Sequence, residues 1–317
     1  MNHSENRWYS ILPRSLKLSQ PVNVKLVSFN VDGSRLVAVS ARVSTSKKPV
    51  EDLWSMEPGE IKTWIKELIR RSHGSPLEHS TYTFEIECSR VCSHQLVRHR
   101  FASYTQQSMR YSEGFLRRTV LVLCKKLGVD CPPRPLKKED YRVYSEIAKI
   151  ATQSLQLEEL AEALSIGFVY NPKWDHRTIE RYNDIYANSL SYYYSLLADD
   201  LHREDARYLV PMAVRTRVVT TMNARELLES FLPLRMCTRA QWEIRLLAWR
   251  IRDELLKVHP EIFTYAGPRC LLEENRIRWE PISLEEYSSG TIEPLIERCP
   301  ELVPRNGIPK CIRYANS

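Results

Sequence analysis

The segment from Arg98 to Tyr111 concentrates cationic and hydroxyl side chains. Its sequence, RHRFASYTQQSMRY, holds three arginines, one histidine, two serines and two tyrosines but no glycine. Arginine stays charged, and its planar guanidinium donates paired hydrogen bonds to phosphate oxygens. A neighbouring serine hydroxyl adds a further donor. The segment is therefore a candidate binding site for a phosphorylated ligand.

Local geometry decides whether these groups can act together. In an extended chain, residues two apart point to the same face, so Arg98 would join Arg100 and Ser108 would join Arg110. In a helix of 3.6 residues per turn the same pairs diverge by about 200°. Phosphate binding here therefore requires extended or loop geometry. The alternative is a solvated basic face with a serine-containing turn.

The glycines exclude two common nucleotide-binding motifs. The nine glycines never stand two apart, so the chain has neither a Gly-x-Gly-x-x-Gly fingerprint nor a P-loop. A bound nucleotide would have to be held by side chains and helix termini. The formal net charge of +7 favours an anionic partner without choosing among nucleotides, nucleic acid and other phosphorylated molecules.

The elements that must position this segment can be predicted from periodicity. Alternating residues predict strands at 22–30, 81–88 and 216–221. Helices are predicted in the segment that ends at Ser44 and at 58–72, 138–164, 176–200, 223–232 and 239–258. Long helices with few, separated strands predict an α+β fold, with an antiparallel or mixed sheet flanked by long helices and no Rossmann fold. The tyrosine stripe on 176–200 indicates core packing rather than a base-stacking platform.

Composition indicates a globular protein. With 43% hydrophobic and 27% charged residues, the 317-residue chain is long enough for one large domain or two ordinary ones, and we predict a single domain. Its apolar runs are too short to cross a bilayer. The start, MNHSENRWYSILPRS, lacks the basic-then-apolar order of a secretory signal. We therefore expect a cytoplasmic protein with no membrane partner.

The eight cysteines show no Cys-x-x-Cys pair, so no zinc or redox motif is evident and no metal site is predicted. Buried free thiols are the expected state. Cys270, Cys299 and Cys311 all lie in the last fifty residues, which we expect to be irregular. A disulfide among these three cysteines is an alternative that the sequence leaves open, since intracellular proteins of hyperthermophiles carry such bonds.

Several motifs resemble those of the flavin-dependent thymidylate synthases. The spacing from RHR at 98–100 to Ser108 resembles the family signature. Further similar blocks occur in the family's order: ARVS (41–44), HGSPLEH (73–79), DARYLVP (205–211), MNAR (222–225), LR (234–235) and AQWEIR (240–245). The resemblance implies FAD-dependent reductive methylation of dUMP to dTMP, with methylenetetrahydrofolate as carbon donor and NADPH as reductant. It also implies a homotetramer with shared active sites.

The resemblance further implies roles for individual residues. Arg98, His99 and Arg100 would contact the flavin and its phosphates, where cations favour the anionic reduced ring. The rest of the cofactor would be lined by Ser44, His73, Ser75, Asn223 and Arg225. The dUMP site would comprise Gln95, Gln106, Ser108, Arg110 and Arg235, with Arg207 contributed by another subunit.

Within this set, the predicted catalytic residues are Arg235, Ser108 and His73. Arg235 would reach the uracil carbonyls and stabilise charge that builds on the ring, and His73 would lie beside the flavin. Ser108 is interpreted as a phosphate ligand rather than a nucleophile, because no activating base stands near it in the sequence. Arg110→Ala is expected to weaken dUMP binding by about 1.5–3 kcal/mol.

The chain also departs from the family pattern. Thr105 and Gln106 stand where many members carry Asn and Glu, and Met109 replaces a frequent glycine. Between Asn223 and Arg235 the chain is one residue longer than compact relatives, so no cofactor contact is assigned there. Residues 113–175 resemble an insertion and residues 267–317 a C-terminal extension, neither with a predicted role.

Two alternatives remain. A basic single-stranded nucleic-acid-binding module is supported by the net charge, the arginines and sixteen tyrosines, although the resemblance argues against a nucleic-acid partner. A flavoprotein that keeps only oxidase activity is the second.

Overall fold

The computed structural model describes residues 16–316. The start of the chain, where no secretory signal was predicted, lies outside the described residues. The chain divides into two compact units. Among the described residues, unit 1 comprises 16–22, 87–94 and 106–217, and unit 2 comprises 23–86, 95–105 and 218–316. Each is described separately, and the prediction of one catalytic domain stays a prediction.

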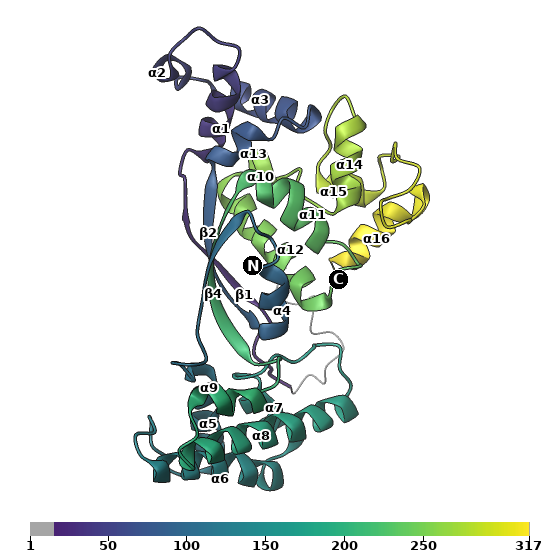
Figure 1. Cartoon of the computed structure of the whole chain (residues 1–317). Helices are drawn as coiled ribbons and strands as arrows, with labels where there is room; N and C mark the ends of the chain where they lie inside the picture. Colours follow the sequence, from purple (N-terminus) through teal and green to yellow (C-terminus); the bar gives the residue numbers. More distant parts are fainter. Residues whose placement is uncertain (1–15, 317) are drawn as a thin grey trace. The chain divides into compact units, whose positions relative to one another are not determined.

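Four strands form one antiparallel sheet in the order β1-β2-β4-β3 (Figure 1). They are β1 (Asn23–Phe29), β2 (Thr81–Ser89), β3 (Ala102–Gln106) and β4 (Arg215–Asn223). The three predicted strands and the α+β fold class without a Rossmann fold are confirmed. Strand β3 was not predicted, because it begins within the polar segment Arg98–Tyr111 and is only five residues long.

Unit 1 is dominated by four mutually packed helices (Figure 1). They are α5 (Gly114–Leu127), α6 (Lys138–Ser154), α7 (Leu157–Leu164) and α8 (His176–Ala198), followed by the short α9 (Arg203–Ala206) and a 3-10 turn at Arg207–Leu209. Tyr186 and Tyr193 are buried, and the Tyr186 ring stacks on Phe168 at 4.5 Å between centroids. Core packing of the tyrosine stripe is confirmed.

The single helix predicted at 138–164 is wrong, because it is divided into α6 and α7. Leu155 is extended, and Gln156 starts α7 through a capping box with Glu159. Such a cap satisfies backbone N–H groups that a continuous helix would pair internally. The apolar spacing runs through the break, which is why periodicity alone did not reveal it.

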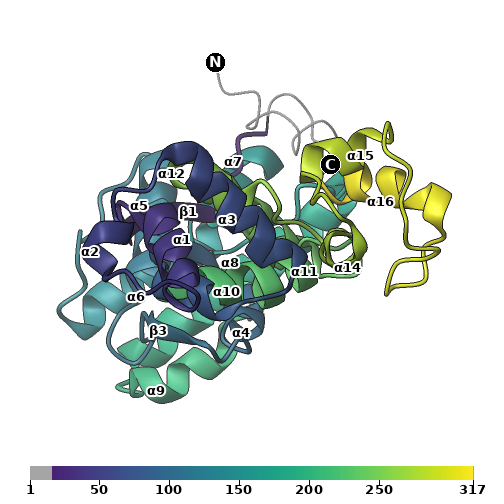
Figure 2. The ribbon, with the colours of Figure 1, turned by 90° about the horizontal axis from the view of Figure 1, so that it is seen from above.

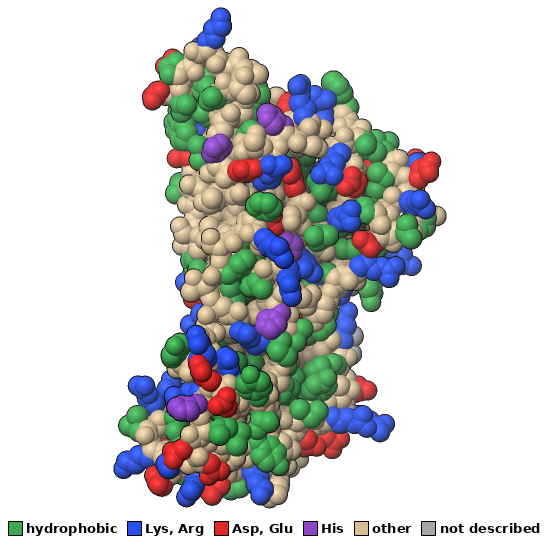
Figure 3. Space-filling model, in the orientation of Figure 1, with side chains coloured by type: hydrophobic (Ala, Val, Ile, Leu, Met, Phe, Trp, Pro, Cys, Tyr) green, Lys and Arg blue, Asp and Glu red, His purple; other side chains and the backbone are tan. Residues whose placement is uncertain are grey.

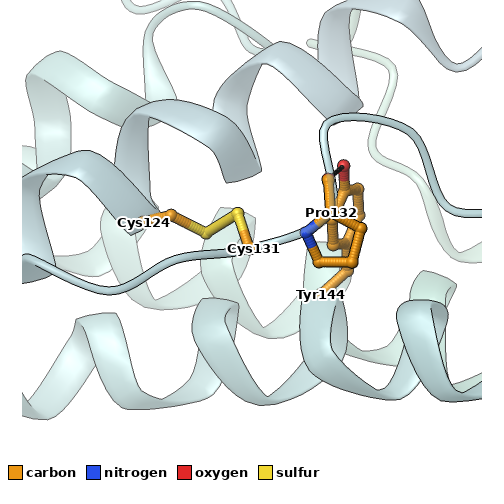
Figure 4. Close-up of a disulfide and its surroundings, with 4 residues drawn as sticks. All are labelled: Cys124, Cys131, Pro132 and Tyr144. Carbon is orange, nitrogen blue, oxygen red and sulfur yellow. Dashed lines mark hydrogen bonds between the residues drawn. A yellow bond between two sulfur atoms is a disulfide. The ribbon is translucent and has the colours of Figure 1, made fainter.

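Unit 1 also contains a disulfide between Cys124 and Cys131 (Figure 4). Gly128, at φ 69°, ends α5 in the left-handed conformation that glycine tolerates, and the chain turns back to bring the two cysteines together. The next residue, Pro132, accepts a hydrogen bond of 2.5 Å from the Tyr144 hydroxyl. The expectation of free thiols is therefore wrong for this pair, whereas Cys270, Cys299 and Cys311 are free.

Unit 2 contains most of the remaining helices. They are α1 (Gly33–Val43), α2 (Val50–Leu53), α3 (Pro58–Arg70), a 3-10 turn η1 (Ser75–His79), α10 (Ala224–Glu226), a π-helix η3 (Leu227–Phe231), α11 (Leu232–Arg235), α12 (Trp242–Val258) and α13 (Pro260–Phe263). The predicted helices at 58–72, 223–232 and 239–258 are confirmed, as is the one ending near Ser44. Helix α4 (Arg90–Leu96) contributes residues to both units.

The last fifty residues are not irregular as predicted. They form α14 (Arg269–Ile277), α15 (Leu284–Ser289), a 3-10 turn at Arg305–Gly307 and α16 (Ile308–Ala315), grouped together in Figure 2. The fully buried Glu274 carboxylate organises them, because it accepts hydrogen bonds from Arg278 and from the Tyr287 hydroxyl. A buried carboxylate needs such partners, and Glu274 also accepts from the backbone N–H groups of Leu295 and Ile296, which lie 21 and 22 residues away.

No helix among the described residues has both the length and the apolar character that a bilayer crossing requires.

We expect Gly33→Ala to destabilise the fold. A Cβ at Gly33 would lie 2.4 Å from Ser80 Oγ and 2.6 Å from Cε1 of His259, whose ring is buried and bonded to the Tyr82 hydroxyl at 2.8 Å. Overpacking of this kind costs about 1–3 kcal/mol. Gly59→Ala is the control, because its Cβ meets nothing within 4 Å. Equal unfolding midpoints in urea for the two variants would contradict the prediction.

Candidate functional site

A buried polar group in unit 2 is centred on His99. The His99 side chain is only 4% exposed, and its Nδ1 lies 3.1 Å from Oε1 of the equally buried Glu226. On the other side of the ring, Arg235 Nε donates a hydrogen bond of 3.0 Å to His99 Nε2. An arginine N–H can only donate, so Nε2 must be the unprotonated nitrogen and Nδ1–H must donate to the carboxylate. The imidazole is thereby held in one neutral tautomer.

The same contacts hold Arg235 in place. Besides its bond to His99, its Nη2 donates to the backbone oxygen of Gln95 at 3.3 Å. Arg235 is half-buried at the end of α11. A guanidinium fixed by two acceptors is preorganised, so it can polarise a ligand oxygen without a large entropic cost.

A π-helix positions the group that holds His99. Glu226 is the last residue of α10, and η3 continues from Leu227 to Phe231. Ser230 Oγ lies 3.4 Å from His99 Nδ1, and the Phe231 ring packs edge-on against the imidazole at 4.9 Å. A π turn accommodates one extra residue in a helix. Such a turn could accommodate the one-residue excess that the resemblance predicts between Asn223 and Arg235.

A second group in unit 2 is formed by η1 and α10. A Cβ at Gly74 would lie 2.5 Å from Arg225 Nε, so the backbone between His73 and Ser75 lies directly against this guanidinium. Arg225 also pairs with Glu78 at 2.6 Å and with Glu229 at 3.0 Å. The structure therefore brings the two separate sequence blocks that contain His73 and Arg225 together.

All predicted cofactor residues lie in unit 2. Six of them have exposed side chains: Ser44, His73, Ser75, Arg98, Arg100 and Arg225. His99 is buried between the two exposed arginines, and the Asn223 side chain caps α10 by accepting from the N–H of Glu226. Ser44 follows α1 and bonds to Ala41 O at 2.8 Å. The exposed arginines and hydroxyls supply donors that an anionic ligand can use.

Unit 1 contains an open cleft with about 550 Å³ of space accessible to water. Three residues that the sequence predicted to bind dUMP line it: Gln106, Ser108 and Arg207. The resemblance implies that Arg207 serves the site of another subunit, but here it lies in the same cleft as Ser108 of its own chain. Arg90 lines it as well, and burial followed by the nearby positive charge of Arg207 lowers the pKa of Arg90. Two cations that repel each other across a cleft favour an anion between them.

The other residues of the segment Arg98–Tyr111 have local partners. Ser108 Oγ accepts from the N–H of Arg110 at 3.2 Å, so this hydroxyl closes a turn. The Arg110 side chain is exposed, pairs with Glu204 at 3.3 Å and does not line the cleft. Gln106 donates through Nε2 to Ser93 and to Thr216. The expected pairing of Ser108 with Arg110 is thus realised as a turn rather than as two side chains in the cleft.

Sequence reasoning missed Glu226 and Arg90. Glu226 lies in the leucine-rich segment ARELLESFL, four positions before Ser230. Residues four apart on a helix share one face, so Glu226 and Ser230 both contact the His99 imidazole. Its place in a hydrophobic helix was the available signal. The signal for Arg90 was weaker, namely that it stands four positions before His94. The two side chains are in contact at 3.2 Å.

Comparison with protein families gives a match over residues 25–261 to the family described as thymidylate synthase complementing protein. The chain is 48% identical over 309 residues to a flavin-dependent thymidylate synthase of Aeropyrum pernix, covering 93% of this chain and 94% of that protein. A flavin-dependent thymidylate synthase of Sulfolobus acidocaldarius is 40% identical over 302 residues, covering 93% and 95%.

Two solved structures share the fold. ThyX of Helicobacter pylori, complexed with FAD and dUMP, has a TM-score of 0.56 at 23% identity and covers 77% of this chain and 99% of that one. The UMP/dUMP methylase PolB of Streptomyces cacaoi, bound with 5-Br dUMP, has a TM-score of 0.55 at 24% identity, covering 78% and 95%.

Proposed function

This chain belongs to the flavin-dependent thymidylate synthase family, and from that premise we propose that it converts dUMP to dTMP with FAD as cofactor. The observation that carries the proposal is the 48% identity to a flavin-dependent thymidylate synthase over nearly the whole length of both proteins. The geometry of the described residues supports it, because unit 2 holds a preorganised arginine and unit 1 a cationic cleft.

The residues of unit 2 fit a flavin dinucleotide. Because Gly74 has no side chain, its backbone lies directly beside the Arg225 guanidinium. Backbone N–H groups next to a guanidinium are suited to binding a pyrophosphate. Ser44, Ser75, Asn223 and Arg225 would hold the cofactor, with Arg98 and Arg100 adding positive charge. When bound, FAD supplies the hydride chemistry of the reaction. Arg225 would exchange at least one of its two carboxylate partners for phosphate.

We assign the cleft of unit 1 to the phosphate of dUMP. Arg90 and Arg207 provide the charge, and Ser108 lines the same cleft. Gln106, neutral where many relatives carry Glu, lets the cleft keep its positive charge. Because two like charges already face each other there, a bound phosphate removes their repulsion as well as forming hydrogen bonds.

We assign Arg235 to the uracil ring of dUMP, next to the backbone of Gln95. Its guanidinium would bind a uracil carbonyl oxygen and stabilise negative charge that develops on the ring. His99 and Glu226 are proposed to act through Arg235 as positioning residues, because His99 accepts from its Nε and Glu226 holds the imidazole. This role differs from the flavin contact that the resemblance implies for His99. His73, exposed beside Gly74, is proposed to lie beside the flavin.

The further partners are also proposals. Methylenetetrahydrofolate would donate the carbon and NADPH the reducing equivalents. A homotetramer with shared sites is proposed from the family resemblance. Light scattering during gel filtration tests the tetramer, and cell fractionation tests the proposed cytoplasmic location.

Turnover of the purified protein tests the whole function. With dUMP, methylenetetrahydrofolate, NADPH and FAD present, dTMP forms, and omission of any one abolishes it. NADPH oxidation without dTMP would instead identify a flavoprotein oxidase. Retention of single-stranded nucleic acid without bound flavin would identify a binding module. Figure 3 argues against that module, because acidic and basic side chains are intermixed over α5–α8 although Lys and Arg gather beside α11.

We expect Glu226→Leu to lower kcat about 10- to 100-fold with a smaller change in KM, because His99 loses the acceptor that fixes its tautomer and Arg235 loses its support. This corresponds to about 1.5–3 kcal/mol, the value of a hydrogen bond to a charged group. Glu226→Gln keeps an acceptor and should restore most of the rate. Equal rates for the two variants in steady-state assays would remove Glu226 from the positioning role.

A further inference from the structure

The cleft of unit 1 has two walls that come from different parts of the chain. One is the segment 106–109, which carries Ser108, and the other is made by residues between 207 and 214. Arg207, on the second wall, directly follows the four-residue helix α9 and starts a 3-10 turn. A helix this short has no stability of its own in water, so tertiary contacts must fix its position. The contacts that hold α9 therefore decide where Arg207 lies.

Arg207 is joined to α9 by its backbone and by its side chain. Its N–H donates to the carbonyl oxygen of Arg203, at the start of α9, and its Nε donates to the carbonyl oxygen of Glu204 at 3.1 Å. At the end of the 3-10 turn, the Ser189 hydroxyl donates to the carbonyl oxygen of Leu209 at 2.6 Å. A displacement of α9 would therefore also move the Arg207 guanidinium.

The Arg203 side chain anchors the start of α9 to the helices of unit 1. Its Nη2 lies 3.4 Å from Oε1 of Glu113 and donates a hydrogen bond of 2.7 Å to the Tyr141 hydroxyl on α6. The Glu113 side chain is 10% exposed and that of Arg203 is 36% exposed. Burial raises the pKa of Glu113, and the positive charge of Arg203 opposes this effect. Water and salt screen a pair at this depth less than a surface pair.

Glu113 is also attached to the opposite wall of the cleft. Although it stands at the N-cap position of α5, its carboxylate pairs with Arg203. In the turn before it, the N–H of Ser112 donates to the carbonyl oxygen of Ser108 at 3.0 Å, so Glu113 follows the cleft segment directly. The ion pair therefore joins the wall that carries Ser108 to the wall that carries Arg207.

A second ion pair connects the same two walls. Arg110 pairs with Glu204 of α9 at 3.3 Å, but both side chains are exposed. Exposed pairs contribute little, because water and salt screen them. The contacts of Arg203 with Glu113 and Tyr141 are thus the stronger connection.

We propose that Glu113 and Tyr141 are positioning residues for phosphate binding, which act through Arg203 and α9 to hold Arg207 in the cleft. The inference rests on the proposed function, in which this cleft binds the phosphate of dUMP. It also assigns a role to part of the segment 113–175, for which the sequence predicts none. Both residues belong to that segment and reach the helix that carries Arg207.

The test measures dUMP binding by calorimetry and dTMP formation in steady state, with the full-length protein and FAD. Glu113→Gln removes the negative charge and keeps the shape of the side chain. We expect the Kd and KM for dUMP to rise about 3- to 10-fold, as for loss of one hydrogen bond, with a smaller change in kcat. A merely structural defect would lower the active fraction, and hence the apparent kcat, without raising KM.

Glu162→Gln is the matched control for this variant. It breaks the pair of Glu162 with Lys126 at 3.1 Å, which joins α7 to α5 within the same unit. Its side chains are similarly shielded, at 25% and 24% exposure, so it reports the general effect of losing an ion pair from these helices. We expect an unchanged Kd for dUMP. A rise equal to that in Glu113→Gln would show a general effect and overturn the inference.

The double variant Glu113→Gln/Arg207→Ala tests whether Glu113 acts through Arg207. We expect it to bind dUMP no more weakly than Arg207→Ala alone, because substitutions that remove the same interaction are not additive. Additive losses of affinity would place the effect of Glu113 elsewhere and overturn the inference. Unchanged dUMP affinity in Glu113→Gln would overturn it as well.

If Glu113→Gln does not fold, Tyr141→Phe takes its place, since it removes only the hydroxyl that accepts from Arg203. Tyr192→Phe is then the control, because it removes an exposed hydroxyl from α8. Equal dUMP affinities of the two Phe variants would reject the inference alone, provided that wild-type protein binds dUMP. Wild-type protein that fails to bind dUMP would reject the proposed function, and the inference with it.

Discussion

Arg235→Ala is expected to lower the rate of dTMP formation by about 100- to 1000-fold while FAD stays bound. Removal of a preorganised donor that stabilises developing charge costs this much in other enzymes. Arg235 is suited to that role because His99 Nε2 and the Gln95 carbonyl already hold it. In the proposed assignment His99 acts on Arg235 rather than on the cofactor, so flavin retention should change little.

Single-turnover measurement of dTMP and the flavin content of the purified variant check this expectation. Arg276→Ala is the matched control, since Arg276 lies on α14 and pairs with Glu273. Loss of flavin with unchanged turnover per bound flavin would reverse the assignment, placing Arg235 at the cofactor instead of at the substrate ring.

Arg207→Ala is expected to raise the Kd for dUMP about 10- to 150-fold. Hydrogen bonds to charged groups contribute about 1.5–3 kcal/mol, and each 1.4 kcal/mol is a factor of ten. Arg207 lines the cleft of unit 1 together with Arg90. The pKa of Arg90 is lowered mainly by burial and, to a smaller extent, by the nearby positive charge of Arg207. Affinity should also fall with added salt, and less steeply in the variant.

Calorimetric titration with dUMP checks the effect, with Arg177→Ala on the exposed face of α8 as the control. Arg110→Ala makes a useful comparison, because the sequence predicts that it also weakens the binding of dUMP by about 1.5–3 kcal/mol. The structure favours a larger effect at Arg207, since Arg110 is paired with Glu204 outside the cleft lining. A greater loss of affinity in Arg110→Ala than in Arg207→Ala would contradict the cleft as the phosphate site.

Local patterns in the sequence predicted the regular elements well. Strand β2 and helix α3 follow alternating and helical periodicities that each extend over at least eight residues. The division between α6 and α7 was missed because a side-chain cap at Gln156 interrupts the helix without interrupting the apolar spacing. The helical C-terminal residues were missed because their organiser, Glu274, acts across long separations in sequence.

By itself the sequence determined the α+β class, the family and the small set of residues to which chemistry can be assigned, because each of these depends on residue types at short, fixed spacings. Only the tertiary structure decided that Glu226 sets the tautomer of His99, that Arg90 joins Arg207, and that Glu113 pairs with Arg203, which stands 90 positions later. Hydrogen bonds and ligand shells act over a few ångströms of space. Residues distant along the chain meet at such distances only after the core has packed.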